Sequence, residues 1–368
     1  MESNENYSHP IYKYVKDIKD ADAVAWAFIN KDKMVQFPFK FPEVGPDELR
    51  INTLYAGLCQ SDVHTVREIW GPCMYPLAPG HEIIGEVSKV GSNVKDFKKG
   101  DLVGFGVLRD CCEKCEYCLK GKDNLCRDVS DVATYGKYWG GYATAMQQPV
   151  KFFFKLPAGF KLEKGAPLFC AGITTYYPLE KFLKPEMKVC GVIGCGGLGH
   201  MAIQFLHKLG HEVVAFTTSE NKKDLLKKLG ADKIVISKDE AQMKAAETTI
   251  DFMINTIPTN TNFNRFIKCI KRGGKLIQVG MPAFDDEMKI NVNMLVSSEI
   301  EIMGSSVGPR EPIKKMVDFC AKNDIYPICE EFPFEKMPEA FEKLEHGRPF
   351  FRCVVNVKDF AEKNGLKK

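Results

Sequence analysis

The central motif of this chain reads Val189-Cys190-Gly191-Val192-Ile193-Gly194-Cys195-Gly196-Gly197-Leu198-Gly199, an apolar run that leads into clustered glycines. The pattern predicts a buried strand that turns sharply into a helix. In a turn of the form Gly194-x-Gly196-x-x-Gly199, one glycine permits the bend, one lets the backbone approach a pyrophosphate, and one lets helix and strand pack closely. The strand before the glycines and the helix after them favour a nucleotide-binding turn over an ordinary glycine-rich loop.

The chain that follows this motif alternates between strands and helices. Strands are expected near residues 189–193, 212–216, 233–236, 251–254, 275–279 and 300–303, with helical segments between them. This order predicts a doubly wound parallel sheet of six strands. From Ala21 to about Phe154 the pattern changes to short β-rich runs broken by turns, which predicts an irregular β domain. A helix is expected to begin at about Arg310, and a strand near residues 351–357.

The composition bounds the class of protein. A length of 368 residues suggests about two domains, and a hydrophobic content of 45% is ample for real cores. The net charge of +3 is small and its lysines are scattered, so nucleic acid is not an expected partner. The first six residues lack the basic and apolar parts of a secretory signal, and no apolar run approaches the roughly 20 residues that cross a membrane. We therefore expect a cytoplasmic protein with no membrane partner.

The strongest local signal is a group of closely spaced cysteines. Four thiolates at this density can surround one tetrahedral Zn²⁺, and a closed set of four indicates a structural site. The bacterial iron–sulfur pattern differs, because three residues separate its third and fourth cysteines and a Pro follows the fourth. Cys111 is an alternative first ligand, although Cys112 keeps two residues between successive ligands. The expected ligands are Cys112, Cys115, Cys118 and Cys126; seven residues separate Cys126 from Cys118, and Arg127 follows it.

Two cysteines and a histidine elsewhere are weak signals when each is taken alone. Cys59 precedes Gln60-Ser61-Asp62-Val63-His64, His81 precedes Glu82, and Cys170 lies before an expected helix start. A lone buried cysteine is usually a small apolar residue, and a lone histidine is usually a hydrogen-bonded core residue.

The end of the second expected strand of the parallel sheet indicates the nicotinamide cofactor. NAD-binding folds normally end this strand in Asp or Glu, which bonds the ribose hydroxyls. Here the strand ends in Thr217, Thr218 and Ser219, and Lys222 follows. Hydroxyl groups and an ammonium group would hold a 2′-phosphate that an acid would repel, so NADP(H) is favoured over NAD(H). In the alternative interpretation, Ser219 caps the next helix and the lysines are a solvated face.

Taken together and in this order, these motifs resemble the zinc-dependent medium-chain dehydrogenase/reductase superfamily, from about residue 20 to the end. The Thr217-Thr218-Ser219-x-x-Lys222 run and Leu168-Phe169-Cys170-Ala171-Gly172-Ile173-Thr174 are most similar to its cinnamyl-alcohol-dehydrogenase branch. The resemblance implies an NADP-dependent alcohol dehydrogenase, usually a homodimer, that acts on a small alcohol or aldehyde. It also implies a GroES-like catalytic domain at residues 1–170 and 310–368, with a structural zinc lobe at about 109–127, and an inserted Rossmann domain at 171–309.

The resemblance further implies roles for single residues and two zinc ions per chain. Cys59, His81 and Cys170 would bind a catalytic zinc with an open fourth position. Glu82 would orient this site or transiently replace water. Ser61 would hydrogen-bond the alcohol oxygen, and His64 would connect the proton relay to solvent through the cofactor ribose. The implied cofactor contacts are Thr174, Gly194, Gly196, Gly197, Leu198, Gly199, Thr217, Thr218, Ser219, Lys222, Val279, Met281 and Ser305.

The substrate range is less sharply defined. Ser306 is small where aromatic-alcohol enzymes of this branch often carry a bulky residue, so a broad range of primary alcohols is expected. Two alternatives stay open: a polyol or secondary-alcohol dehydrogenase of the same superfamily, and a non-catalytic protein that binds zinc and NADPH. The second has no need for the proton path through Ser61 and His64.

Overall fold

The computed structural model describes residues 7–128, 137–258, 262–283, 286–347 and 349–366. Contacts within the chain divide it into two compact units. The first contains Met1–Cys170, Pro309–Val317 and Ile328–Lys368, and the second contains Ala171–Gly308 and Asp318–Pro327. The segment Asp318–Pro327 thus packs with the second unit, although the sequence analysis assigned it to the GroES-like domain.

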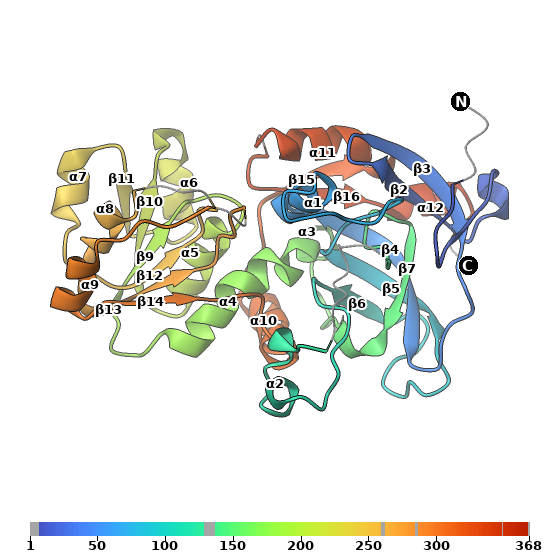
Figure 1. The fold of residues 1–368 in the computed structure, drawn as a ribbon, viewed down its shortest axis with the longest axis horizontal. Coiled ribbons are helices and arrows are strands. Elements are labelled where there is room, and N and C mark those ends of the chain that lie inside the picture. Colours follow the sequence, from blue (N-terminus) through green and yellow to red (C-terminus); the bar gives the residue numbers. More distant parts are fainter. Residues whose placement is uncertain (1–6, 129–136, 259–261, 284–285, 348, 367–368) are drawn as a thin grey trace. The chain divides into compact units, whose positions relative to one another are not determined.

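The first unit is built on β4 (Glu48–Leu58), an almost completely buried strand of 11 residues. It pairs antiparallel with three strands, β5 (Ile83–Val90), β7 (Ala145–Pro149) and β16 (Arg352–Asn356). The seven-stranded sheet has the order β15-β16-β4-β5-β6-β8 with β7 beside β4, and its other strands are β6 (Leu102–Phe105), β8 (Phe153–Lys155) and β15 (Cys329–Pro333). The short strand runs of the sequence thus form a β domain whose strands pair antiparallel except for the parallel pair of β15 and β16 (Figure 1).

A smaller sheet and several helices complete the core of this unit. The sheet has the order β1-β3-β2, and Trp139, Tyr142 and several phenylalanines fill the core beside it. Helix α11 packs against β4 and β16, and α1 packs against α11. The bounds are β1 (Lys13–Tyr14), β2 (Ala23–Asn30), β3 (Lys33–Lys40), α1 (Gln60–Val66), α2 (Glu116–Leu119), α3 (Leu162–Gly165), α11 (Met337–Glu345) and α12 (Lys358–Lys363).

The second unit contains the predicted parallel sheet. Its order is β11-β10-β9-β12-β13-β14, and every neighbouring pair is parallel. The strands are β9 (Val189–Ile193), β10 (Glu212–Thr217), β11 (Lys233–Ile236), β12 (Ile250–Asn255), β13 (Ile270–Gln278) and β14 (Glu301–Gly304). This is the strand order of dinucleotide-binding sheets, in which ligands bind at the carboxyl ends of the strands. The predicted α/β fold class, with a doubly wound parallel sheet of six strands and a separate β-rich domain, is therefore confirmed.

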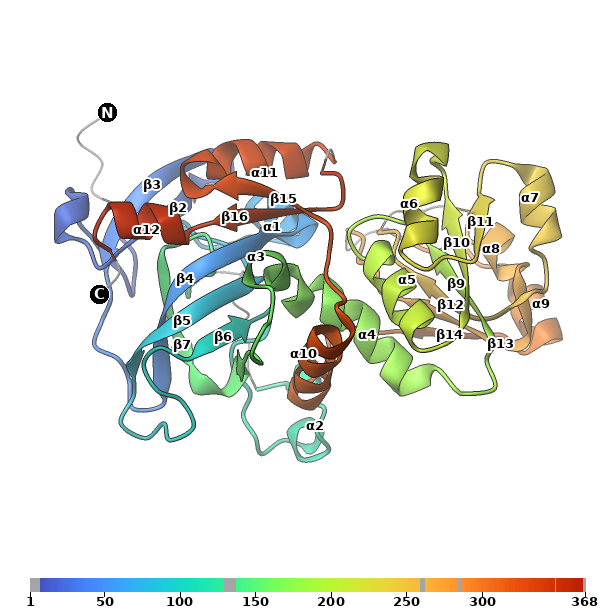
Figure 2. The same cartoon turned by 180° about the vertical axis from the view of Figure 1, so that it is seen from behind.

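Helices flank this sheet (Figure 2). Helix α5 packs against β9 and β10, and α8 and α9 pack against β13. Helix α10 begins at the predicted residue, Arg310, and runs to Asn323. The helix bounds are α4 (Ala171–Phe182), α5 (Gly199–Lys208), α6 (Lys223–Lys228), α7 (Glu240–Ala245), α8 (Asn264–Ile267) and α9 (Val292–Ser298). None of the described helices combines the length and apolar character that crossing a membrane requires.

Candidate functional site

Four buried side chains that could bind a metal converge in the first unit. The ligand atoms of Cys59, His81, Glu82 and Cys170 all lie within 4.8 Å of one another. The Sγ atoms of Cys59 and Cys170 are 3.8 Å apart, and Nε2 of His81 is 3.2 Å from Sγ of Cys170. The structure thus brings together residues that are 111 and 89 positions apart in the chain.

The sheet explains why these residues meet. Cys59 follows directly after β4, and the residue pair Ala56 and Ile83 joins the end of β4 to the start of β5. His81 and Glu82 immediately precede β5, so they lie beside Cys59. A short 3₁₀ segment, Ala166–Phe169, packs against β4 and β5 and delivers Cys170 to the same place.

Asp62 holds the residues of this cluster in place through hydrogen bonds. It is fully buried, and its carboxylate accepts hydrogen bonds from the backbone N–H groups of Cys59 at 3.0 Å and Gly80 at 3.1 Å. Oδ1 of Asp62 also lies 3.0 Å from Nδ1 of His81, and the hydroxyl of Tyr142 donates to Oδ2 at 3.1 Å. Because Asp62 engages Nδ1, it leaves Nε2 of His81 facing the thiols, as metal-binding histidines require.

Glu82 contributes a carboxylate whose two oxygens differ. Oε1 accepts a hydrogen bond from Arg352, whereas Oε2 is buried and has no hydrogen-bond partner among the described residues. Arg352 reaches this position because Leu58 and Cys353 pair between β4 and β16. Gly57 leaves the necessary space, since a Cβ there would lie 2.1 Å from Oε2. A buried, unpaired carboxylate oxygen beside two thiols fits the coordination sphere of a cation.

The protonation of the two thiols points the same way. A hydrogen bond from Cys170 is the main cause that lowers the pKa of Cys59 well below its usual value, and the same bond raises the pKa of Cys170. This contact thus favours the thiolate of Cys59, the form in which cysteine binds a metal. In a zinc tetrahedron with Zn–S bonds of about 2.3 Å, neighbouring sulfurs lie about 3.8 Å apart, which agrees with the observed separation. The donor set and its spacing thus fit zinc.

Helix α1 carries the two predicted relay residues. Sγ of Cys59 donates to Oγ of Ser61 at 3.5 Å, which places the hydroxyl next to the cluster. His64 lies one turn further along the helix, and its ring packs edge-on against Trp70 at 4.8 Å. Its Nδ1 is buried without a hydrogen-bond partner among the described residues. Residues three apart share one face of a helix, so Ser61 and His64 lie on the same side of α1.

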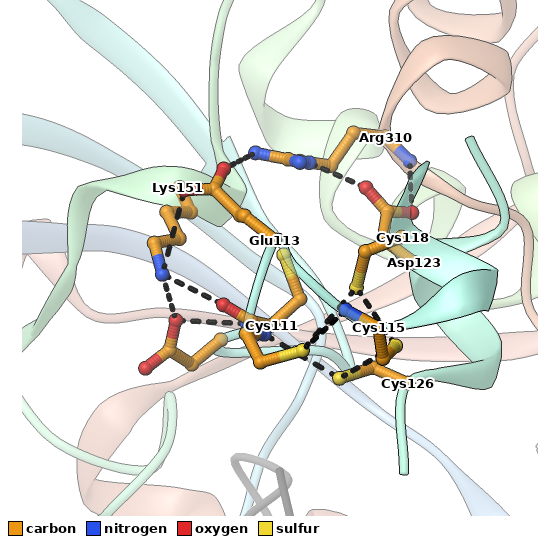
Figure 3. Close-up of polar contacts among 10 residues, drawn as sticks. Cys111, Glu113, Cys115, Cys118, Asp123, Cys126, Lys151 and Arg310 are labelled. Carbon is orange, nitrogen blue, oxygen red and sulfur yellow. Dashed lines mark hydrogen bonds and ion pairs between the residues drawn. The ribbon is translucent and has the colours of Figure 1, made fainter. Parts of the chain in front are cut away.

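A second cluster consists of the four closely spaced cysteines (Figure 3). Sγ of Cys118 lies 3.9 Å from Sγ of Cys112 and 3.5 Å from Sγ of Cys115, and Sγ of Cys115 lies 4.0 Å from that of Cys126. These separations also match the edge of a ZnS₄ tetrahedron, about 3.8 Å. Hydrogen bonds, first among them one from the backbone N–H of Cys118, lower the pKa of Cys115 to about 6 and so favour its thiolate.

Cys111, the alternative to Cys112 as first ligand of the four-cysteine site, lies outside this cluster. Cys111 does not belong to the group of mutually close ligand atoms, and its thiol is almost fully buried. Its carbonyl oxygen accepts a hydrogen bond from Nζ of Lys151 at 2.7 Å. The geometry therefore favours Cys112 over Cys111.

The glycine turn of the second unit has the three properties that its sequence predicts. Gly194 adopts a φ of +83°, which favours glycine. A Cβ on Gly196 would meet nothing within 4 Å, so the backbone there is open to a ligand, while a Cβ on Gly199 would lie 1.8 Å from the carbonyl oxygen of Gly194. Helix α5 begins at Gly199 after the N-cap residue Leu198. The turn thus offers the start of a helix to a phosphate group.

The other predicted cofactor contacts mostly follow the carboxyl ends of strands. Thr217 ends β10, and its Oγ1 accepts a hydrogen bond from the backbone N–H of Ser219 at 3.2 Å. Ser219 precedes the 3₁₀ turn Glu220–Lys222, but its side chain makes no capping hydrogen bond, contrary to the capping interpretation. Val279 and Met281 follow β13, Ser305 follows β14, and Thr174 lies on α4.

Sequence reasoning missed three residues of the buried cluster. Asp62 stands three residues after Cys59, the spacing of a capping box, and this signal could have identified it. Tyr142 and Arg352 have no comparable signal, because Tyr142 is 80 positions from Asp62 and Arg352 is 270 positions from Glu82.

Comparisons with known proteins agree with this geometry. Residues 45–158 match the family described as alcohol dehydrogenase GroES-like domain, and residues 197–322 match the family described as zinc-binding dehydrogenase. Cinnamyl alcohol dehydrogenase 2 of Rauvolfia serpentina is 37% identical over 91% of this chain and 95% of its own. Aldehyde reductase YahK of Escherichia coli is 37% identical over 87% of this chain and 93% of its own.

A solved structure is also similar. The cinnamyl alcohol dehydrogenase from Helicobacter pylori, complexed with NADP(H), superimposes with a TM-score of 0.83 at 32% identity, covering 91% of this chain and 98% of its own.

Proposed function

Because the chain belongs to the zinc-containing medium-chain alcohol dehydrogenases, in the branch of the cinnamyl alcohol dehydrogenases, we propose that it interconverts primary alcohols and aldehydes with NADP(H) as the hydride carrier. Membership in this family makes the chain a zinc-dependent oxidoreductase. The nicotinamide cofactor, the class of alcohol and the roles of individual residues are our proposal. The observation that carries it is the convergence of Cys59, His81, Glu82 and Cys170 in one buried cluster.

Cys59, His81 and Cys170 would hold the catalytic zinc. With zinc bound there, these residues would present a Lewis acid to the substrate oxygen. Asp62 fixes the ring of His81, and Arg352 holds one oxygen of Glu82 while the other faces the cluster. Three protein ligands would leave a fourth coordination position open for substrate, with the carboxylate of Glu82 nearby. A closed site of four cysteines has no such open position.

Ser61 and His64 would move the proton. The hydroxyl of Ser61 lies at the cluster through its contact with Cys59, where it can hold the alcohol proton at Oγ. His64 stands one turn further along α1 and can pass that proton on at a ring nitrogen. A protein that only binds zinc and NADPH needs no such pair, so the two residues support catalysis over a purely binding role.

The end of β10 supports NADP(H). NADP(H) supplies the hydride, and the chain must supply a site for its 2′-phosphate. Thr217, Thr218 and Ser219 offer hydroxyl groups where NAD-dependent folds carry an acid, and Lys222 follows in the adjoining 3₁₀ turn. The relative from Helicobacter pylori has NADP(H) in its structure.

The proposal also covers the domain bounds, the structural zinc, the assembly state and the substrate range. We assign residues 1–170 and 310–368 to the catalytic domain and 171–309 to the cofactor domain, although Asp318–Pro327 belongs to the compact unit of the cofactor domain. The structural zinc would be held by Cys112, Cys115, Cys118 and Cys126. The expected assembly is a homodimer. The small Ser306 favours a broad range of aldehydes over strict preference for cinnamyl substrates.

The experiment is a screen of aromatic and aliphatic aldehydes, ketones and sugars with NADPH and with NADH. We expect the highest kcat/KM with aldehydes and NADPH. Faster turnover of ketones or sugars would instead favour the secondary-alcohol or polyol dehydrogenase, and no turnover with any of them would favour a binding protein.

A further inference from the structure

Arg310, the first residue of α10, contacts the loop that carries the four closely spaced cysteines (Figure 3). This segment is called the cysteine loop below, and its two arms are residues 112–115 and 118–126. Its guanidinium group donates to the carboxylates of Asp123 and Glu113, the latter at 2.8 Å. Its backbone N–H also donates to Oδ1 of Asp123 at 3.1 Å. The contacts join residues 187 and 197 positions apart, all within the first unit.

The two carboxylates stand at different places in the loop. Glu113 lies between Cys112 and Cys115 and has a left-handed φ of 58°. Asp123 lies between Cys118 and Cys126, and its carbonyl oxygen accepts the backbone N–H of Cys126 at 3.1 Å. One guanidinium group therefore connects the arm that carries the first two thiols to the arm that carries the last two.

The two contacts differ in strength. The side chain of Asp123 is only 5% exposed, whereas that of Glu113 is 50% exposed. A partly buried, charge-assisted pair contributes more than an exposed one, so Asp123 is the principal partner. Arg310 also lies over the buried ring of Phe152, at 5.6 Å from its centroid. Lys151 binds the carboxylate of Asp110 at 2.9 Å and also pairs with that of Glu113 at 3.8 Å.

We propose that Arg310 is a positioning residue that clasps the two arms of the cysteine loop, slows the release of its metal, and is in turn held in place by that metal. The inference rests on the proposed zinc site of Cys112, Cys115, Cys118 and Cys126. The loop has little regular structure of its own, since α2 and the 3₁₀ segment Asp123–Leu125 span only four and three residues. Four thiolates repel one another, and a bridge between the arms reduces the conformational entropy that metal binding must overcome.

The coupling must be reciprocal. Asp123 accepts from the backbone N–H of Arg310, in the first turn of α10, where a carboxylate stabilises a helix. A metal that fixes Asp123 therefore also fixes the start of α10, and an ordered helix start favours the bound metal by the same free energy. The structural zinc would thus act on a segment distant from it in the sequence.

The test measures metal release at each site separately. Zinc-loaded chain is incubated with EDTA and iodoacetamide, and mass spectrometry follows alkylation of Cys112, Cys115, Cys118 and Cys126, with Cys59 and Cys170 as the internal reference. In Arg310→Gln we expect the lobe thiols to react about tenfold faster than in the unaltered chain, with the reference thiols unchanged. Arg310→Lys should lie between the two, because lysine keeps the charge but not the fork of donors.

The matched control is Lys314→Gln, which removes an exposed cation from the same helix and should react like the unaltered chain. Equal alkylation in Arg310→Gln and the unaltered chain would overturn the clasp. A chain without zinc at the lobe would overturn the metal site itself, so the two failures are distinguishable. If Arg310→Gln does not fold, Glu113→Gln weakens both the exposed contact with Arg310 and the 3.8 Å pair with Lys151. Lys151→Gln then controls for the second pair, and Glu113→Gln must release metal faster than both the unaltered chain and Lys151→Gln for the clasp to stand.

The reciprocal half has its own measurement. Removal of zinc should raise hydrogen exchange in the peptide that covers residues 310–317 of the unaltered chain, and this response should disappear in Arg310→Gln. An equal response in both would contradict the coupling.

Discussion

Asp62 and His81 form a fully buried pair, with 3.0 Å between Oδ1 of the carboxylate and Nδ1 of the ring. The pair turns Nε2 of His81 toward the thiol of Cys170, so the carboxylate decides which ring nitrogen is available to a metal.

The first prediction concerns this pair. Asp62→Asn keeps the shape but weakens the acceptor at Nδ1, so the affinity of the catalytic site for zinc should fall by about 10- to 100-fold. We expect zinc per chain to fall from two to one after dialysis against a weak chelator, with turnover lost in parallel. Asp251→Asn is the control, because Asp251 also accepts two backbone N–H groups, those of Lys188 and Val189, but lies outside both clusters. Retention of both zinc ions by Asp62→Asn would contradict the role of the pair.

The second prediction separates chemistry from cofactor binding. Cys59→Ala removes one thiolate from the buried cluster, so turnover should become undetectable and one zinc ion should be lost. NADPH affinity, measured by nicotinamide fluorescence, should stay nearly unchanged, because the glycine turn lies in the other unit. Cys73→Ala removes a partly buried thiol outside both clusters and should leave turnover intact. Undiminished turnover of Cys59→Ala would refute the site.

Features formed by residues close together in the sequence could be predicted from it, whereas features formed by distant residues could not. The parallel sheet and the glycine turn were predicted from the sequence, because strand periodicity and the roles of Gly194 and Gly199 are local. The cysteine quartet is local as well. By contrast, Cys59, His81 and Cys170 were ordinary residues when each was taken singly, and only the resemblance grouped them. Their metal-binding role stays a prediction.

The contacts that hold the clusters together were not predicted. Arg352 reaches Glu82 only through the pairing of β16 with β4, and Arg310 reaches Asp123 from 187 positions away. A hydrophobic pattern determines which face of a strand is buried, but it does not identify the partner of a buried charge. Such pairs become visible only when the topology is known.

The third prediction concerns the cofactor phosphate. Lys222→Ala should weaken NADPH binding by about tenfold and NADH binding much less, because a charge-assisted contact to the 2′-phosphate is lost. Lys223→Ala is the control, since Nζ of Lys223 already pairs with Glu220 at 3.4 Å. Dissociation constants of both nucleotides for both variants decide the matter. Equal weakening of NADPH and NADH by Lys222→Ala would show that Lys222 does not contact the phosphate.

The fourth prediction concerns acid stability. Burial lowers the pKa of His9 from 6.5 to about 4, while its Nδ1 accepts the backbone N–H groups of Ile11 and Tyr12, both at 3.1 Å. Between these two pH values the unfolded chain binds a proton that the folded chain does not. Stability from neutral His9 is therefore complete above about pH 6.5 and is lost as the pH falls toward 4. His9→Asn keeps an acceptor for the turn and should flatten this part of the curve.

Tryptophan fluorescence during urea unfolding provides the measurement for His9. All three tryptophans of the chain, Trp26, Trp70 and Trp139, belong to the first unit, so the signal reports on that unit alone. An equal loss of stability between pH 6.5 and 4 in the unaltered chain and in His9→Asn would contradict the assignment.

The central claim is that Cys59, His81 and Cys170 hold a metal ion with room for substrate, and anomalous diffraction at the zinc absorption edge tests it most directly. We predict two peaks per chain, one among the four cysteines of the lobe and one about 2.3 Å from both Sγ of Cys59 and Sγ of Cys170 and about 2.1 Å from Nε2 of His81. A zinc-loaded, active enzyme that gives a peak at the lobe and none at the buried cluster would contradict the account.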